Sequence, residues 1–353
     1  MPTLKVGLIG CGRIAQLVHI NVLASLPGVK LVALAEPDPQ RREAACRLVP
    51  GALALTDYQE LLALSDVEAV VISLPTWLHV EAAIAALNCG KHLYLEKPLA
   101  TNLADADRLI AAWRESEVKA MIGLNYRFNP LHIEARALLQ AGRIGEVFSV
   151  RSIFTSRGGE LPAWLQKRET GGGVLLELAS HHFDLLPYLL GSQVREVEST
   201  IESLISENDY AALTMRLEGD TMVQSCFFFG SRREDCFEVY GRQGKLVIDR
   251  FRSLRVELTE DPDASSRFQR LRHTLGLIMH SRLLGDDLLA PKREPSYAMA
   301  LAHFVDCVRH DHVPSPDLLD GRRSLAVVEA AEESAKTGQM VSLPDSTDED
   351  FAC

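Results

Sequence analysis

The sequence of 353 residues has no extended cluster of basic side chains. It carries 37 Lys and Arg against 48 Asp and Glu, and its formal net charge is −11. Nucleic acids and anionic membranes are bound through clustered Lys and Arg, so this chain is a poor candidate for either partner. The basic stretches that are present (232–233, 250–255 and 267–272) are short, and we interpret them as solvated surface.

Three further features are missing. No apolar run is long enough to span a bilayer, and the opening segment "LKVGLIG" has the pattern of a buried strand, not of a secretory signal. The seven cysteines are scattered without CxxC spacing, and no Cys/His cluster suggests a metal site. We therefore expect a cytoplasmic protein with reduced thiols, no bound metal and no membrane partner. Residues 346–353 are acidic and are expected to be disordered.

A glycine turn between a strand and a helix is the first positive signal. Residues 10–15 read GCGRIA within "LKVGLIGCGRIAQLVHINVLASL". Gly10 allows a tight turn, Gly12 lets the backbone approach a pyrophosphate, and Ala15 permits close packing of the helix on the strand. The phosphates would lie at the helix N-terminus, where N–H groups and the helix dipole favour anions.

The second strand ends in an acidic residue, Glu36. A carboxylate at this position accepts hydrogen bonds from the adenosine ribose hydroxyls and repels a 2′-phosphate, which favours NAD as the cofactor. Arg41 and Arg42 are close in sequence and can pair with a phosphate, so NADP stays open as the alternative.

Strands and helices alternate up to residue 124. Apolar runs at 69–75, 91–98 and 119–124 alternate with helix-like segments at 79–90 and 103–116. This pattern is typical of a parallel sheet covered on both faces. We predict an α/β Rossmann domain that binds a dinucleotide over residues 1–124.

Glu96, Lys97 and Pro98 end one of these strands at the carboxyl edge of the sheet, where ligands bind in open α/β folds. A lysine there can hydrogen-bond a substrate hydroxyl and stabilise an oxygen that gains negative charge. A surface lysine paired with Glu96 is the alternative. The residues expected at the cofactor are Gly10, Gly12, Arg13, Ile14, Glu36, Leu74, Pro75, Glu96 and Lys97.

A polar stripe interrupts the apolar segment "GGGVLLELASHHFDLL" at residues 171–186. Glu177, His181 and Asp184 are spaced i, i+4 and i+7, so a helix would project them from one face. A histidine near a carboxylate is suited to proton transfer near neutral pH. The alternative is a solvated face with an incidental ion pair.

Together these stretches resemble the glucose-fructose oxidoreductase / inositol dehydrogenase / MocA (Gfo/Idh/MocA) family over nearly the whole chain. The resemblance is carried by "GCGRIA", "LPTWLHVEAAIAALNCGKHLYLEKPLATN", "GLNYRFNP", "GGGVLLELASHHFDLLPYLLG" and "DGRRSLAVVEAAEESAKTGQMVSLP". The element "GKHLYLEKP" followed by the histidine segment, in this order and spacing, is specific to the family.

The resemblance implies that residues 125–345 form an α+β domain with a large, mostly antiparallel open sheet. Strand-like runs joined by short turns, such as 218–220 and 241–244, agree with this expectation. In the family the outer face of this sheet commonly forms subunit contacts, and the apolar run 227–229 needs burial. We therefore expect a homodimer or a homotetramer.

The family's motifs also imply roles for individual residues. Lys97 would orient the substrate and transfer a proton, His181 would be the general base, and residue 177 would contact substrate hydroxyls. The family usually has aspartate at that position, in a D-x-G-x-H-x-x-D run, whereas this chain has Glu177 and Ala179. The extra methylene moves the carboxylate, which suits a differently shaped sugar or altered chemistry. Asp184 would orient His181 or close a structural pair.

Other polar and aromatic residues are candidates for the substrate cleft, with a structural role as the alternative for each. They are Tyr126, Arg127, Asn129, Trp164, Lys167, Arg168 and His182. His79 and His92 are interpreted as structural or cofactor-edge residues.

The sequence therefore predicts an NAD(P)-dependent oxidoreductase that transfers a hydride between the nicotinamide and a secondary alcohol or ketone of a sugar, inositol or sugar derivative. Two alternatives remain open. An NAD-dependent glycosidase of the same family would oxidise a sugar transiently and release a free sugar without net NADH. A non-catalytic NAD-binding regulator would show no turnover. Segment 265–297 departs from the strand pattern and is expected to form a helical insert over the cleft or at a subunit contact.

Overall fold

The computed structural model describes residues 3–158, 161–260 and 294–344. Its first part is a parallel six-stranded sheet in the order β3-β2-β1-β4-β5-β6. The strands are β1 Leu4–Ile9, β2 Val29–Ala35, β3 Leu53–Leu55, β4 Ala69–Ile72, β5 His92–Leu95 and β6 Ala120–Ile122. The strand order reverses at the β1/β4 pair, and ligands of open α/β sheets bind beyond the strand ends at such a point.

Helices on both faces of this sheet explain why its central strands are largely buried and apolar. They are α1 Ile20–Ser25, α2 Pro39–Leu48, α3 Tyr58–Leu62, α4 His79–Asn88 and α5 Leu103–Arg114. Every residue of β4 and β6 is buried, as expected for strands covered on both sides. The predicted Rossmann fold is confirmed.

The second part is an eight-stranded sheet in the order β13-β12-β11-β7-β10-β9-β8-β14. Its strands are β7 Val147–Ser156, β8 Val194–Glu202, β9 Tyr210–Leu217, β10 Met222–Phe229, β11 Glu234–Gly241, β12 Gly244–Asp249, β13 Glu257–Glu260 and β14 Val341–Ser342. β7 and β10 pair in parallel, and the other pairs of described strands in this sheet are antiparallel. The expected mostly antiparallel sheet is therefore confirmed.

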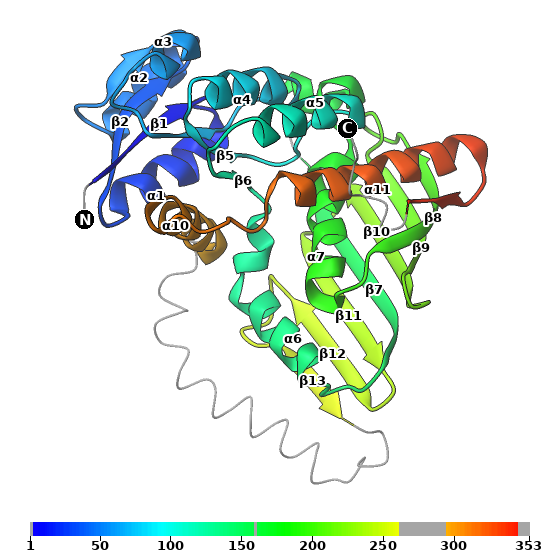
Figure 1. The fold of residues 1–353 in the computed structure, drawn as a ribbon. Coiled ribbons are helices and arrows are strands. Elements are labelled where there is room, and N and C mark those ends of the chain that lie inside the picture. The colour runs from blue at the N-terminus through cyan, green and yellow to red at the C-terminus, as the bar shows by residue number, and fades with distance from the viewer. Residues whose placement is uncertain (1–2, 159–160, 261–293, 345–353) are drawn as a thin grey trace.

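Four helices accompany the second sheet and connect it with the first. They are α6 Pro130–Gln140, α7 Ser180–Leu190, α10 Pro295–His310 and α11 Leu318–Thr337. α10 returns to the nucleotide-binding half, where Leu301 and Phe304 join the core beneath β1, and it lies beside α1 (Figure 1). α11 runs from β6 of the first sheet to β8 of the second (Figure 1). Two helices late in the chain thus hold the two halves together.

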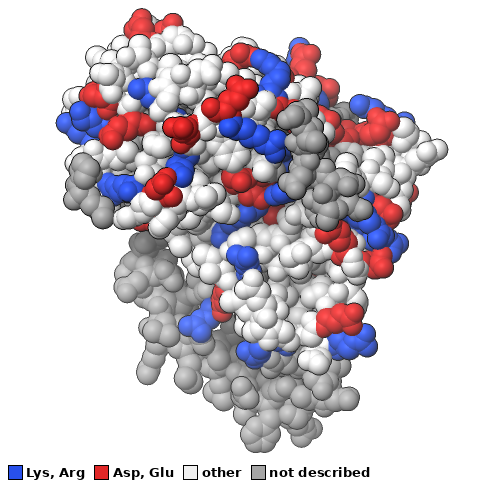
Figure 2. Space-filling model, viewed as in Figure 1, with Lys and Arg blue, Asp and Glu red and all other residues white. Residues whose placement is uncertain are grey.

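The described helices α6, α7 and α11 pack on one face of the second sheet (Figure 1). The opposite face presents half-buried apolar side chains, including Tyr210, Cys226 and Phe228. On the face of the molecule seen in Figure 2, Lys and Arg are mixed with Asp and Glu, and no broad basic patch is visible. None of the described helices has the length and apolar character needed to cross a membrane.

A buried ion-pair cluster lies inside the second domain. Asp235 on β11 accepts a hydrogen bond from Nε of Arg250 at 2.6 Å, and Nη1 of Arg250 donates to Glu294 at 3.0 Å. The side chain of Arg250 is only 10% exposed, so the interpretation of stretch 250–255 as solvated surface was wrong for this residue. Although burial opposes its charge, Asp235 has a pKa well below its usual value because Arg250 and His182 lie beside it.

The predicted insert 265–297 lies mostly outside the described residues, apart from its last four residues, 294–297. The predicted acidic tail, 346–353, also lies outside them.

The buried cluster leads to a stability prediction. Asp235→Asn keeps the shape of the side chain but leaves the charge of Arg250 undercompensated, so the free energy of unfolding at pH 7 should fall by about 3 kcal/mol. Because the pKa of Asp235 is depressed in the folded state, this advantage of the wild type is present above pH ~4, the value for an unfolded Asp, and is lost as the pH falls through the folded pKa. Denaturant unfolding of both proteins across this range measures it.

Asp220→Asn is the matched control, because Asp220 is 71% exposed and its ion pairs lie on the surface. It should change stability by about 0.5 kcal/mol or less. An equal loss for both variants, or a difference that does not change with pH, would contradict the assignment of a buried, charge-paired Asp235.

Candidate active site

The glycine turn after β1 contains two glycines with different surroundings. Gly10 has φ +88°, and a Cβ atom there would overlap the carbonyl oxygen of Ser73. Apart from Gly12 and its chain neighbours, no atom of the described residues lies within 4 Å of the position that a Cβ of Gly12 would take. Gly12 precedes the π-helical turn Ala15–His19 that leads into α1, and the first N–H groups of a helix have no partner within it. Open space beside such groups fits a pyrophosphate.

Glu36 stands at the end of β2 and is tied to this turn. Its Oε2 accepts a hydrogen bond from the backbone N–H of Cys11 at 2.8 Å, and its Oε1 accepts one from Asp38 at 3.1 Å. The guanidinium of Arg42 donates to the carbonyl oxygen of Glu36 at 2.6 Å. The carboxylate therefore lies at the carboxyl edge beside the glycine turn, with its charge partly compensated by backbone dipoles.

His79 connects the loops that follow β4 and β5. One ring nitrogen lies 2.9 Å from the carbonyl oxygen of Leu74 and the other 2.8 Å from that of Pro98, and whichever nitrogen carries the proton donates. Burial lowers the pKa of His79. The prediction of a structural role is confirmed for this histidine, and the bridge positions Leu74 next to the Glu96–Pro98 loop.

Glu96 has a buried partner that the sequence pattern did not reveal. Nε2 of His19, at the end of the π-helical turn, lies 2.8 Å from its Oε1. The ring of His19 is fully buried between Tyr94 and Tyr297. The extra residue of a π-helical turn re-aims side chains, which a regular helical period cannot predict. The glycine-turn helix and the Glu96–Pro98 loop are thereby held together.

Lys97 and Glu177 meet across the junction between the two halves. Nζ of Lys97 donates to the backbone oxygen of Glu177 at 2.8 Å and to its Oε2 at 3.0 Å. The side chains are 12% and 33% exposed, so the pair is largely shielded from water but still accessible. The alternative of a surface lysine paired with Glu96 is not what the structure contains.

The histidine segment begins as a π-helical turn, Leu175–Ala179, and continues as α7. Its three polar side chains have three different partners: Glu177 contacts Lys97, His181 stacks on Tyr126, and Asp184 binds Arg127. All three partners belong to segments that follow β5 or β6. The three side chains therefore share one face, as the i, i+4, i+7 spacing predicted, and the structure shows that this face meets the nucleotide-binding half.

His181 is held flat against Tyr126. The ring centroids are 3.9 Å apart and the planes differ by 8°. Burial, and after it the charges of Lys97 and Arg250, bring the pKa of His181 well below its ordinary value, so the imidazole is neutral at neutral pH. Its Nδ1 is buried without a hydrogen-bond partner in the described part of the chain. A neutral imidazole near Lys97 can accept a proton.

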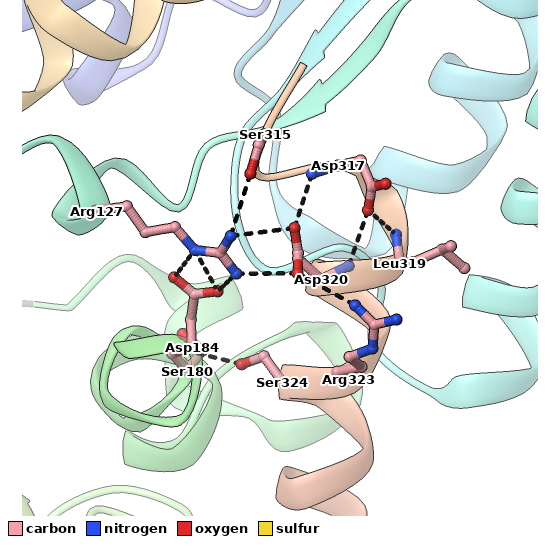
Figure 3. A network of polar contacts seen from close by, with 9 residues as sticks. All are labelled: Arg127, Ser180, Asp184, Ser315, Asp317, Leu319, Asp320, Arg323 and Ser324. Carbon is pink, nitrogen blue, oxygen red and sulfur yellow. Dashed lines mark hydrogen bonds and ion pairs between the residues drawn. The ribbon is translucent and has the colours of Figure 1, made fainter. Parts of the chain in front are cut away.

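Arg127 is committed to a structural network (Figure 3). Its guanidinium donates to Asp184 on α7 at 2.5 to 3.0 Å, to Asp320 at the start of α11 at 3.2 Å, and to the hydroxyl of Ser315. Asp184 therefore closes a structural pair and does not orient His181. The prediction that Arg127 contacts the substrate was wrong, because Asp184, Asp320 and Ser315 already accept hydrogen bonds from its guanidinium.

His182 points into the second sheet and not into the cleft. Its ring is fully buried, with Nδ1 3.1 Å from the hydroxyl of Ser152 and Nε2 3.1 Å from Asp235. The prediction that His182 contacts the substrate was therefore wrong. Adjacent helical residues point about 100° apart, so His181 and His182 cannot share the cleft.

The loop before the three glycines also has mainly structural contacts. Arg168 makes a two-pronged ion pair with Glu332 on α11 and donates to the carbonyl oxygen of Thr101 at 2.9 Å, so it is not free for a substrate. Asn129 caps α6 and donates to Glu294 at 2.9 Å. Position 171, the first of the three glycines, requires glycine because a Cβ atom there would overlap the side chain of Thr76.

Trp164 and Lys167 from the same loop are less constrained. Trp164 is half-buried, and its carbonyl oxygen accepts a hydrogen bond from the hydroxyl of Thr170 at 2.6 Å. Lys167 is 68% exposed. Among the residues that the structure describes, no group of His, Cys, Asp and Glu is arranged to hold a metal ion.

The site combines a glycine turn of the dinucleotide-binding type with a lysine–carboxylate pair and a neutral histidine. This combination is typical of a two-domain, nicotinamide-dependent oxidoreductase. Comparison with family models agrees with this class. Residues 4–124 match the oxidoreductase family with an NAD-binding Rossmann fold, and residues 132–247 match the GFO/IDH/MocA C-terminal domain. The chain belongs to the GFO/IDH/MocA family and is an NAD-dependent oxidoreductase.

Similar curated proteins extend over nearly the full chain. Myo-inositol 2-dehydrogenase from Thermotoga maritima is 27% identical over 354 residues, covering 96% of this chain and 98% of the relative. The scyllo-inositol 2-dehydrogenase (NAD(+)) from Bacillus subtilis is 26% identical and covers 96% of both chains. The 1,5-anhydro-D-fructose reductase from Ensifer adhaerens is 28% identical, covering 96% of this chain and 98% of the relative.

Solved structures share the fold at lower identity. The WlbA dehydrogenase from Bordetella pertussis, in complex with NADH and UDP-GlcNAcA, has a TM-score of 0.82 at 24% identity and covers 98% of this chain and 99% of its own. Levoglucosan dehydrogenase in complex with NADH and levoglucosan has a TM-score of 0.85 at 21% identity and covers 97% and 99%. At these identities the likeness establishes the fold.

The glycine turn gives a prediction that separates binding from folding. Gly12→Ala places a methyl group in open space, so the free energy of unfolding of the apoprotein should change by about 0.5 kcal/mol or less. The same methyl group would obstruct the pyrophosphate, and NADH affinity should fall about 10-fold or more. Fluorescence titration with NADH and denaturant unfolding measure the two effects.

Gly10→Ala is the contrasting variant. It should destabilise the apoprotein by about 1–3 kcal/mol, because alanine is strained at this positive φ and overlaps Ser73. If Gly12→Ala bound NADH as tightly as the wild type, the dinucleotide would have to lie elsewhere.

Proposed function

We propose that this protein interconverts a secondary alcohol and a ketone on a sugar, inositol or related polyol, with NAD as the cofactor. The observation that carries the proposal is the contact of Lys97 with Glu177, at 2.8 and 3.0 Å, beside the edge where the Rossmann sheet binds its ligand. The names of the relatives described above refer to inositols and to a sugar ketone, which supports this substrate class.

The cofactor would be held by residues at the carboxyl edge of the first sheet. Gly10, Gly12, Arg13 and Ile14 would cradle the pyrophosphate, and Glu36 would accept hydrogen bonds from the ribose; Leu74, Pro75, Glu96 and Lys97 would lie toward the nicotinamide. NAD, when bound, supplies the carbon that exchanges a hydride with the substrate. Arg42 is tied to the carbonyl oxygens of Glu36 and Pro37 at 2.6 and 3.1 Å, which supports NAD over NADP.

The chain's own residues supply orientation and proton transfer. Lys97 would hydrogen-bond the reacting oxygen and stabilise the negative charge that develops there. His181 would accept the hydroxyl proton in the oxidative direction, because its imidazole is neutral. Glu177 would accept a hydrogen bond from a second hydroxyl. Trp164 would contribute ring surface to the cleft. The predicted substrate contact of Tyr126 is not supported, because its ring is buried against His181 and Arg250.

The same proposal includes a homodimer or homotetramer formed through the outer face of the second sheet. Support comes from the half-buried apolar side chains on that face, such as Tyr210 and Phe228. Cytoplasmic residence is also proposed, and it is supported by the six described cysteines, all of which are free thiols.

The direct test is an assay of NADH formation with a panel of inositols and free sugars, combined with identification of the product. A ketone formed together with stoichiometric NADH is the expected result. A free sugar released from a glycoside without net NADH would instead identify the glycosidase alternative. NADH binding without turnover of any compound would favour the regulator.

Lys97→Met should lower kcat by about 10²- to 10⁴-fold, because it removes the charge and the donor at the reacting oxygen. The dissociation constant of NADH should change by less than about 3-fold. Lys30→Met applies the same chemical change to an exposed lysine of the same domain and should leave both quantities unchanged. A comparable loss of turnover and NADH affinity in Lys97→Met would mean that the lysine serves the cofactor and not the chemistry.

The role of His181 predicts the shape of the pH profile. Its pKa is lowered by burial and by Lys97, so kcat/KM in the oxidative direction should stay high at neutral pH and decline only well below pH 6.5, where the imidazole becomes protonated. His181→Asn should lower kcat/KM and remove this acidic decline. Steady-state rates across pH measure both effects. An unchanged acidic decline in the variant would assign it to another group.

A further inference from the structure

The start of α10 is hydrogen-bonded to residues at the junction between the two halves. Glu294 accepts hydrogen bonds from Asn129 at 2.9 Å and from Arg250 at 3.0 Å. Two residues later, the hydroxyl of Ser296 accepts one from Asn125 at 2.7 Å, and Ser296 is fully buried. The backbone on the N-terminal side of Tyr297 is therefore fixed in place by three bonds to buried groups.

Tyr297 packs beside the His19–Glu96 pair, and Glu96 directly precedes Lys97 in the chain. Its ring meets the ring of His19 edge to face at 6.0 Å, and His19 in turn contacts Glu96 at 2.8 Å. Burial, followed by the charges of Glu96 and Glu177, raises the pKa of Tyr297 above its ordinary value. Glu177 is the carboxylate bonded to Lys97. The ring is thus placed beside the loop that carries Lys97, and the phenol stays protonated, so it remains a donor at working pH.

The hydroxyl of Tyr297 makes no hydrogen bond to any described residue, and the side chain is only half-buried. A tyrosine whose ring is packed and whose hydroxyl stays accessible can present that hydroxyl to a ligand. Tyr94 provides a comparison on the other side of the same histidine, with its ring 6.0 Å from His19. The hydroxyl of Tyr94 is also without a partner, but that residue is fully enclosed in the core. Of these two phenols, only Tyr297 is open to a ligand.

We propose that Tyr297 is a substrate-binding residue whose phenol donates a hydrogen bond to an oxygen of an uncharged polyhydroxylated substrate held against the Lys97–Glu177 pair. This inference rests on the proposed function. The ammonium of Lys97, the carboxylate of Glu177 and the neutral phenol form a set that recognises neighbouring hydroxyl or carbonyl oxygens. A fixed donor in a cleft shielded from water strengthens such recognition, because little solvent competes for the bond.

Tyr297→Phe removes only the hydroxyl and is the informative variant. The assay uses the inositol or free sugar that the wild type oxidises fastest. We expect kcat/KM for this substrate to fall about 10-fold or more, which is the cost of one lost hydrogen bond to a reacting or orienting oxygen. NADH affinity and Tm should match the wild type. Tyr94→Phe is the matched control and should leave kcat/KM unchanged, because its hydroxyl is enclosed.

Each other outcome overturns the inference in a recognisable way. A wild-type kcat/KM in Tyr297→Phe would show that the phenol does not contact the substrate. A loss of NADH affinity with normal KM for the substrate would assign the hydroxyl to the cofactor. Equal losses in Tyr297→Phe and Tyr94→Phe would indicate a packing effect. A wild-type protein that binds NADH but oxidises nothing would refute the proposed function itself, and this inference with it.

Discussion

The amine of Lys97 and the carboxylate of Glu177 come from different halves of the chain, and their contact defines where the two halves meet. A half-shielded ion pair of this kind depends on geometry, because a small separation of the two groups would return both charges to water. The relative position of the two sheets is therefore part of the site. A shift of about 1 Å between reacting groups can cost a large part of an enzyme's activity.

Buried charges hold that relative position. Arg127 links α7 and α11 through Asp184 and Asp320, while Arg250 links β11 to the start of α10 through Asp235 and Glu294 (Figure 3 for the first network). In a low-dielectric interior each of these charges needs its partners in place, so the networks permit few alternative arrangements. They also explain why several arginines near the cleft are not available to bind an anionic substrate.

Much of the fold could be predicted from short-range pattern. The apolar strands and the glycine turn correctly indicated a Rossmann sheet, and the helical spacing of Glu177, His181 and Asp184 correctly indicated a polar stripe on one face. The partners within that stripe could not be predicted, since spacing says which face a side chain occupies and not what packs against it. His182 illustrates the limit: it is adjacent to His181 in sequence, yet it is buried against Ser152 and Asp235.

The contacts of Arg250, His19 and Tyr297 could not be predicted from the sequence, and the reason is the same for all three. Arg250 occurs in a stretch that resembles solvated surface, and its two carboxylate partners are 15 and 44 residues away. His19 is re-aimed by a π-helical turn, and Tyr297 lies on α10, far along the chain from the His19 ring against which it packs. Local periodicity and turn chemistry were thus sufficient to predict the Rossmann sheet and its glycine turn, while the second sheet was predicted through the family resemblance. The pairing of charges and the side chains that close the cleft were decided by contacts between distant segments, because burial makes each charge depend on partners that no local pattern contains.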